Sequence, residues 1–123
     1  MRRLRILLVD DHEVVRLGLK ALIGRQPSFE VIGEAGTADE AVEKARVHKP
    51  DVTVMDIRLP GKSGIDATRE IVQLDPSAVV VMCSALGQES LVMEAIEAGA
   101  TDFIVKPFRG EDVLAVVKKV LGE

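Results

Sequence analysis

The chain has 123 residues, a length that suits a single domain with a buried core. Its 20 acidic and 16 basic side chains give a formal net charge of −4 and are interspersed, so they predict no basic surface for nucleic acid. Because no apolar segment reaches the roughly 20 residues of a membrane span and Cys83 is the only cysteine, we expect a cytoplasmic protein without a disulfide framework.

Short apolar runs alternate with longer segments of helical periodicity along the chain. The runs, which predict strands, are residues 4–9, 29–35, 52–55, 78–83 and 103–105. Four of them are almost uninterrupted, as expected of strands that helices cover on both faces. The second run carries Glu30 and Glu34, and we therefore place it at an edge of the sheet.

Apolar residues spaced three and four apart predict a helix after each strand. The five stripes are Val15, Leu19, Leu22 and Ile23; Ala38, Ala41, Val42 and Ala45; Ala67, Thr68, Ile71 and Val72; Leu91, Val92, Ala95 and Ile96; and Val113, Val116, Val117, Val120 and Leu121. Residues 37–40 and 63–66 have the pattern of capping boxes, which predicts where the second and third helices begin. Gly99 is placed to turn the chain from the fourth helix into the last strand.

The repeated alternation predicts a parallel sheet with helices on both faces. In such sheets, ligands bind beyond the carboxyl ends of the strands, where the strand order reverses. Polar residues directly follow four of the runs: Asp10 and Asp11 after the first, Asp56 after the third, Ser84 after the fourth and Lys106 after the fifth. We therefore expect three carboxylates, a hydroxyl and an ammonium group to converge on one site.

Three clustered carboxylates need a compensating cation, because two of them about 4 Å apart repel by up to ~4 kcal/mol at an effective dielectric constant near ~20. Lys106 supplies one positive charge. A Mg²⁺ ion would supply more and would leave coordination positions for phosphate oxygens. The cluster thus suits phosphoryl transfer, with Asp56 as the nucleophile. Ser84 either donates to a phosphoryl oxygen or caps the following helix, and both interpretations stay open.

Three segments resemble the CheY-like receiver domain of two-component response regulators, namely residues 7–12 (LLVDDH), 54–64 (VMDIRLPGKSG) and 99–108 (GATDFIVKPF). The resemblance covers essentially the whole chain, residues 1–123, as one domain. It implies a doubly wound α/β fold, CheY-like or flavodoxin-like, with a five-stranded parallel sheet of order 2-1-3-4-5 and five flanking helices. Residues 10–19 are similar to receivers that precede LuxR-type (NarL/FixJ) DNA-binding domains.

The resemblance implies that a sensor histidine kinase phosphorylates Asp56 in a Mg²⁺-dependent reaction. The domain would be a signalling phosphoacceptor that catalyses only its own phosphorylation and dephosphorylation, not an enzyme with a separate substrate. The metal ligands implied are Asp10, Asp11, Asp56 and the backbone carbonyl of Arg58.

The resemblance also implies a conformational switch. Lys106 would pair with Asp56 and then with the phosphoryl group, and the peptide bond between Lys106 and Pro107 would be cis. Ser84 would move towards the phosphoryl group while Phe103 rotates inward. The face formed by the fourth helix, fifth strand and fifth helix would change, and it could support phosphorylation-dependent homodimerisation.

Other reactive side chains have structural interpretations. His12 adjoins the acid pair but directly precedes a helical stripe, so we interpret it as a residue of the first helical turn and not as a metal ligand. His48 is interpreted as a helix-end residue. Cys83 and Met93 are expected to pack in the core.

Competing functions are weighed against the same residues. A phosphohydrolase of the haloacid dehalogenase type needs a second Asp where Arg58 stands. A nucleotide or flavin site needs a glycine-rich loop where residues 10–13 read DDHE. A pseudo-receiver, which binds partners without phosphorylation, remains the alternative. We expect a C-terminal or separate DNA-binding output domain, so that transcription is regulated without direct nucleic-acid binding by this segment.

Overall fold

Strands and helices alternate through the whole of the computed structural model, which describes residues 3–85, 87–106 and 109–122. The strands are β1 (Leu4–Val9), β2 (Phe29–Ala35), β3 (Val52–Asp56), β4 (Val80–Ala85) and β5 (Asp102–Lys106). The helices are α1 (Glu13–Ile23), α2 (Ala38–His48), α3 (Gly64–Leu74), α4 (Glu89–Glu97) and α5 (Gly110–Val120). All the predicted elements are present. β4 both begins and ends two residues later than expected, and because it ends at Ala85, Ser84 lies inside the strand and not after it.

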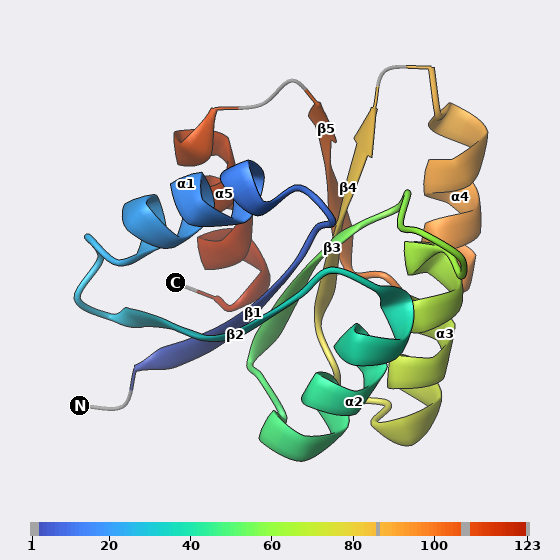
Figure 1. Cartoon of the computed structure of the whole chain (residues 1–123), viewed down its shortest axis with the longest axis horizontal. Helices are drawn as coiled ribbons and strands as arrows, with labels where there is room; N and C mark the ends of the chain where they lie inside the picture. Colours follow the sequence, from blue (N-terminus) through green and yellow to red (C-terminus); the bar gives the residue numbers. More distant parts are fainter. Residues whose placement is uncertain (1–2, 86, 107–108, 123) are drawn as a thin grey trace.

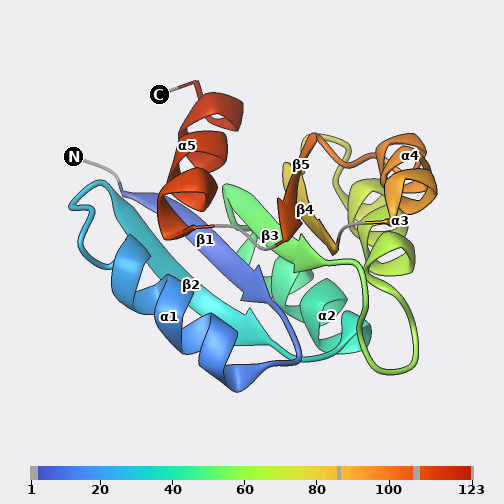
Figure 2. The same cartoon turned by 90° about the horizontal axis from the view of Figure 1, so that it is seen from above.

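The five strands form one parallel sheet of order β2-β1-β3-β4-β5, which confirms the predicted doubly wound topology. Helices α1 and α5 cover one face, and α2, α3 and α4 cover the other (Figures 1 and 2). β2 lies at an edge, as Glu30 and Glu34 predicted. None of the helices in the described part of the chain is long and apolar enough to cross a bilayer.

Alternate residues of each strand supply two aliphatic cores, one on each face. In β1, Leu7 faces the core beneath α2 to α4, whereas Ile6 and Leu8 face the core beneath α1 and α5. All three are at most 1% exposed. Fully burying an aliphatic side chain stabilises the fold by about 1.5–3 kcal/mol, so the central strands are held firmly. This rigidity fixes where their carboxyl ends lie.

The two predicted capping boxes mark real helix starts. The Thr37 hydroxyl accepts a hydrogen bond from the Glu40 backbone N–H at 3.2 Å, and α2 begins at the next residue. The Glu40 carboxylate accepts a hydrogen bond from the Gly36 N–H, one residue before the cap. The Ser63 hydroxyl likewise accepts from the Asp66 N–H at 3.2 Å and starts α3. α3 therefore begins eight residues after β3 ends, close to the acidic end of the sheet.

On the outer side of α4, two residues that were predicted to be buried are exposed. Ala95 is fully buried, but Ile96 is 41% exposed and Met93 is 61% exposed, so the expectation that they pack inside is wrong. The reason is that β5 is the edge strand of the sheet, so that within the described part of the chain no further strand extends the sheet beneath that side of α4. After α4, Gly99 adopts a φ of 115° and turns the chain into β5 as predicted.

Candidate functional site

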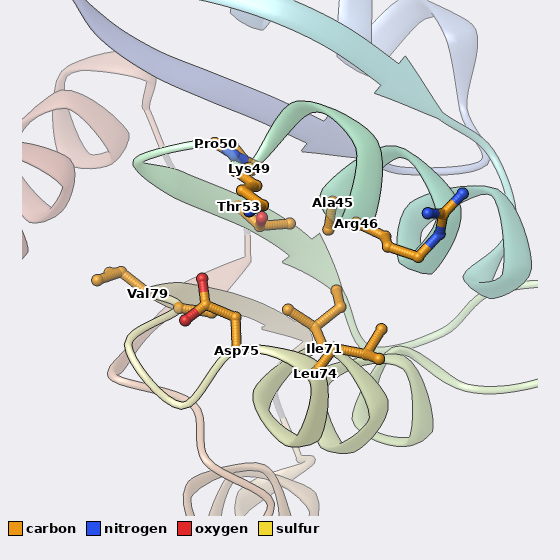
Figure 3. Close-up of a pocket in the computed structure, with 10 residues that line it drawn as sticks. Ala45, Arg46, Lys49, Pro50, Thr53, Ile71, Leu74, Asp75 and Val79 are labelled. Atoms are coloured by element: carbon orange, nitrogen blue, oxygen red, sulfur yellow. The ribbon is translucent and has the colours of Figure 1, made fainter.

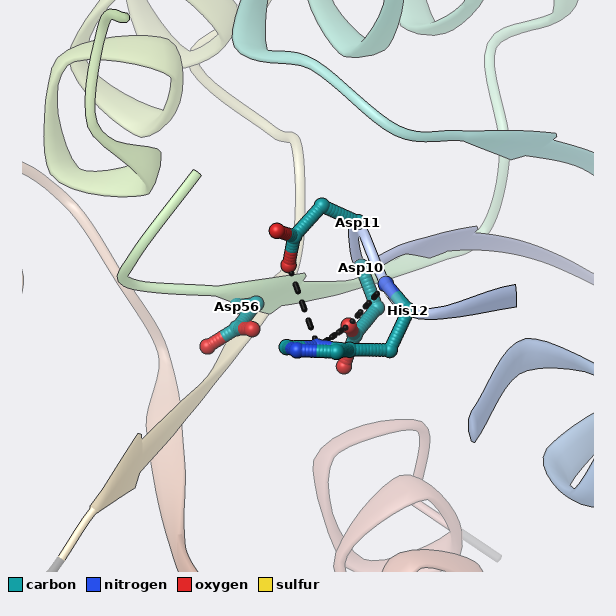
Figure 4. Close-up of side chains that lie close together, drawn as sticks. All are labelled: Asp10, Asp11, His12 and Asp56. Atoms are coloured by element: carbon teal, nitrogen blue, oxygen red, sulfur yellow. Dashed lines mark hydrogen bonds and ion pairs between the residues drawn. The ribbon is translucent and has the colours of Figure 1, made fainter. Parts of the chain in front are cut away.

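The carboxyl ends of β1 and β3 bring three acidic side chains together (Figure 4). Asp10 and Asp11 follow β1 directly, and Asp56 is the last residue of β3. One ligand atom from each, together with one from His12, all lie within 4.8 Å of one another. Asp10 and Asp56 are each only 5% exposed. The strand order reverses between β1 and β3, so the cluster lies where ligand sites of doubly wound sheets are expected.

Lys106, the last residue of β5, reaches two of these acids. Its Nζ lies 3.1 Å from Asp56 Oδ2 and 3.6 Å from Asp10 Oδ2. Burial opposes the charged form of Lys106, but its hydrogen bond to Asp56 and the charges of both acids together raise its pKa. Lys106 therefore stays cationic, and it balances one of the three carboxylates.

The surroundings of Asp56 disfavour its charged form. Burial raises its pKa and the charge of Asp10 adds to the effect, while the hydrogen bond and charge of Lys106 and the backbone N–H of Arg58 act in the opposite direction. The net direction is upward. One ammonium group does not fully compensate the cluster, and a further cation would relieve it. The donor set consists of carboxylate oxygens, which suits a hard divalent ion.

His12 belongs to the cluster, although its position before a helical stripe led us to interpret it only as a residue of the first helical turn. It is the N-cap of α1, one residue before the helix begins, and its ring turns back to the acids (Figure 4). Nδ1 lies 2.9 Å from Asp10 Oδ1 and 3.1 Å from Asp11 Oδ1. The hydrogen bond to Asp10 and the charges of Asp11 and Asp10 raise the pKa of His12. The only signal in the sequence was that His12 directly follows the acid pair.

Arg16 holds the loop that carries the acid pair. Its Nη1 donates to the Asp10 carbonyl, and its Nε donates to Glu34 Oε1 at 3.1 Å. Lys20 pairs with the other Glu34 oxygen at 2.9 Å, and the bonds from these two cations lower the pKa of Glu34. The edge strand β2 is thereby tied to the loop after β1. Sequence reasoning assigned Glu34 only to an edge and missed Arg16.

Gly64 lies directly against the backbone of Asp56. A Cβ built on Gly64 would lie 1.9 Å from the Asp56 carbonyl oxygen, so no side chain fits. The Gly64 N–H donates to the Ile57 carbonyl at 2.8 Å, and the Thr68 hydroxyl donates to the Gly64 carbonyl at 2.8 Å. The start of α3 is therefore packed onto the end of β3, and this contact positions Asp56.

Ser84 has a buried hydroxyl with no hydrogen-bond partner among the described residues. The residue is 1% exposed. It does not cap α4, whose N-cap is Gln88, so the capping interpretation of Ser84 is wrong. An unpaired buried hydroxyl costs about 1–3 kcal/mol, and such groups are often reserved for a function.

Ser84 also lines a largely apolar cavity of 310 Å³ between α4 and β5. Phe103, another wall of this cavity, is 40% exposed, so its ring is not inside the protein. Arg58 lies in the loop after β3 with an exposed side chain. The peptide bond between Lys106 and Pro107 lies outside the described residues.

Cys83 is the neighbour of Asp56 in the sheet, and its position in the core is confirmed. The two residues are register partners across β3 and β4. Burial raises the pKa of the Cys83 thiol to about 12. The thiol is therefore protonated and inert near neutral pH.

A separate cavity of 120 Å³ lies between α2 and α3 (Figure 3). Thr53 and Val79 place it at the amino ends of β3 and β4, opposite to the acidic cluster. Lys49 and Asp75 lie at its margin. None of the residues predicted for the functional site lines it.

Comparison with known proteins agrees with this geometry. The sequence model of the response regulator receiver domain matches residues 6–118. The chain is similar to the chemotaxis protein CheY of Thermotoga maritima, with 49% identity over 94% of this chain and 96% of that protein. A LuxR-family two-component response regulator from Aurantimonas sp. has a similar structure, with a TM-score of 0.92, 38% identity and coverage of 98% and 86%. So does the CheX–CheY–BeF3–Mg²⁺ complex of Borrelia burgdorferi, with a TM-score of 0.90, 35% identity and coverage of 97% and 90%.

The close contact of Gly64 generates a first prediction. Gly64→Ala is expected to lower the free energy of unfolding by about 1–3 kcal/mol, because the added methyl group forces the start of α3 away from Asp56. Gly18→Ala is the matched control, since Gly18 is also helical and no atom lies within 4 Å of its would-be Cβ. In this control the free energy of unfolding should rise by about 0.5–1 kcal/mol, because alanine favours a helix more than glycine does. Urea unfolding measures both, and equal stability of the two variants would contradict the packing argument.

The bonds of Arg16 generate a second prediction. Arg16→Met keeps an unbranched side chain but removes the donors to Asp10 and Glu34, and a loss of about 1–2 kcal/mol in the free energy of unfolding is expected. Arg46→Met is the control, because Arg46 pairs with Glu43 on the exposed surface of α2 and should matter little. If both variants unfold at the same urea concentration, Arg16 does not anchor the loop.

Proposed function

The chain belongs to the response regulator receiver family, and on that premise we propose that it accepts a phosphoryl group on Asp56 from a sensor histidine kinase. We assign residues 1–123 to a single receiver domain. The observation that carries the proposal is the buried Asp56 carboxylate, which is paired with Lys106 at 3.1 Å. The unpaired hydroxyl of Ser84 supports it, because a phosphoryl oxygen would give that donor an acceptor.

Asp56 suits the acceptor role better than the other two acids. Asp10 Oδ1 already accepts hydrogen bonds from the backbone and ring of His12, and its Oδ2 faces Lys106. Asp11 is more exposed, with 32% of its side chain accessible. Asp56 is buried and is paired with the ammonium group of Lys106. The same ammonium group can stabilise the negative charge of a phosphoryl group attached to Asp56.

The carboxylates fit a magnesium ion as the further cation. Asp10, Asp11, Asp56 and the backbone carbonyl of Arg58 would hold it, and their all-oxygen donor set is the one Mg²⁺ prefers. The bound ion would neutralise carboxylate charge and bind phosphoryl oxygens. The similarity to the Borrelia burgdorferi CheY, solved with BeF3 and Mg²⁺, supports this assignment.

The transfer step is a substitution at phosphorus. A carboxylate oxygen of Asp56 attacks the phosphorus of a phosphohistidine, so a P–O bond forms while the P–N bond breaks and the imidazole leaves. Lys106 neutralises the charge that accumulates on the phosphoryl oxygens. Ser84 then donates its unpaired hydroxyl to one of them. Water then attacks the phosphorus of the acyl phosphate, the bond from phosphorus to the Asp56 oxygen breaks, and inorganic phosphate leaves the restored carboxylate. These two reactions of its own side chain are the ones that the domain would catalyse.

The cavity between α4 and β5 offers a route for the conformational switch. Movement of Ser84 towards the phosphoryl group would free space in this cavity, and Phe103 could turn inward from its exposed position. Because Phe103 has no hydroxyl, packing alone would hold the inward state. The change would alter an apolar face that includes Met93, Ile96 and Val105.

We propose that this face carries the signal onward. Phosphorylation adds a charge of about −1.5 to −2, which is enough to bias a bistable loop. The domain would act in the cytoplasm, and its partners would be a sensor histidine kinase, a second phosphorylated copy, and a C-terminal or separate DNA-binding output domain. The similarity to a LuxR-family response regulator supports the last of these.

Phosphorylation is tested directly with a small donor. In Mg²⁺ and acetyl phosphate, the wild-type protein should gain the mass of one phosphoryl group, and the adduct should be lost at alkaline pH. Asp56→Asn should gain none, because the amide is not a nucleophile. Asp39→Asn, which alters a side chain that is 85% exposed, should behave as wild type. A folded wild-type protein that stays unmodified would instead indicate a pseudo-receiver.

Metal binding is tested through thermal unfolding. At a Mg²⁺ concentration about a hundred times its dissociation constant, the free energy of unfolding of the wild-type protein should rise by about 2.7 kcal/mol. Removal of the ion with EDTA should reverse this rise. Asp11→Asn should be more stable than wild type without metal, because one repulsive charge is gone, and should gain less from Mg²⁺. Asp39→Asn again serves as the control. An equal Mg²⁺ response in all three proteins would place the ion elsewhere.

A further inference from the structure

The acidic cluster is flanked by an ammonium group at one oxygen of Asp10 and by an imidazole ring at the other. Asp10 Oδ2 faces Lys106, whereas Asp10 Oδ1 faces the His12 ring. Asp11 Oδ1 also lies on the His12 side. An ion bound by the carboxylates stays away from the ammonium group, because like charges repel. The side that remains for it is the side on which His12 lies.

The spacing of these atoms matches that of ligands on one metal ion. Neighbouring ligands at right angles, each about 2.1 Å from the metal, lie about 3 Å apart. His12 Nδ1 lies 2.9 Å from Asp10 Oδ1 and 3.1 Å from Asp11 Oδ1. The ligand atom of His12 also lies within 4.8 Å of a carboxylate oxygen of Asp56. His12 is thus within reach of an ion that all three acids touch.

Apart from its contacts with the two acids, the His12 ring does not stabilise the start of α1. Although His12 is the N-cap of α1, its side chain makes no capping hydrogen bond. The side chain is 66% exposed, so it can adjust without disturbing the core. The other histidine, His48, ends α2 and lies outside the cluster. The burial of Cys83 and its raised pKa keep its thiol from acting as a ligand.

We propose that His12 is an additional ligand that lets the metal site hold a transition ion such as Co²⁺, Ni²⁺ or Zn²⁺ through one imidazole nitrogen and carboxylate oxygens. Imidazole suits these ions, whereas Mg²⁺ favours oxygen alone. This inference rests on the proposed metal site. An ion that also binds His12 has one fewer open position for a phosphoryl oxygen, so it would compete with Mg²⁺ and slow the phosphorylation of Asp56.

The test compares Co²⁺ and Mg²⁺ binding to the full chain in three proteins. His12→Ala should weaken Co²⁺ binding at least tenfold by calorimetry without weakening Mg²⁺ binding. Wild-type protein loaded with Co²⁺ should show paramagnetically shifted imidazole resonances in its proton NMR spectrum, and these should be lost in His12→Ala. His48→Ala, the matched control, should keep both the affinity and the shifted signals.

Three outcomes would overturn the inference. If His12 is only a counter-cation of the acids, His12→Ala will bind Co²⁺ and Mg²⁺ both more tightly. If the shifted resonances survive in His12→Ala and vanish in His48→Ala, the ion lies at the other histidine. In either case, Mg²⁺-dependent phosphorylation of Asp56 would leave the proposed function intact. Failure of the wild-type protein to bind either ion would overturn both proposals.

Discussion

The excess of carboxylates over cations at one end of the sheet is the constraint on which the site depends. Three acids converge, and Lys106 balances only one of them at a distance of 3.1 Å. Such a cluster is costly, because each buried charge is repelled by its neighbours. The same imbalance makes the site receptive to a metal ion. Function and electrostatic cost therefore have one origin.

The scaffold around the cluster keeps these charges from moving apart. Arg16 holds the main chain of the first acid pair and links it to Glu34 on the edge strand. Gly64 holds the main chain of Asp56 from the other side. Both contacts act on backbone atoms, which leaves the carboxylate oxygens available. The central strands, whose aliphatic side chains are almost wholly buried, carry the acids on a rigid base.

The sequence predicted what depends on local pattern, and it missed what depends on packing. The parallel sheet, the edge position of β2 and the three acids of the cluster followed from the apolar runs and from the residues that end them, whereas the strand order followed from the resemblance to receiver domains. The turn of the His12 ring could not be predicted, because it depends on the angle at which α1 leaves β1. The exposure of Met93 was also missed, since periodicity shows that a helix is amphipathic but not which neighbours it has. The capping interpretation of the Ser84 hydroxyl could be rejected only once the structure showed that Gln88 is the N-cap of α4.

The protonated thiol of Cys83 has a consequence for the chemical survival of the proposed intermediate. An aspartyl phosphate is an acylating agent, and a thiolate beside it would capture the carbonyl as a thioester. Cys83 is the cross-strand partner of Asp56, yet its pKa of about 12 keeps sulfur in the form that is a poor nucleophile. The apolar core thus does more than support the sheet. It would shield the proposed aspartyl phosphate from reaction with this side chain, and water and the groups at the carboxyl ends of the strands would then set the lifetime of the aspartyl phosphate.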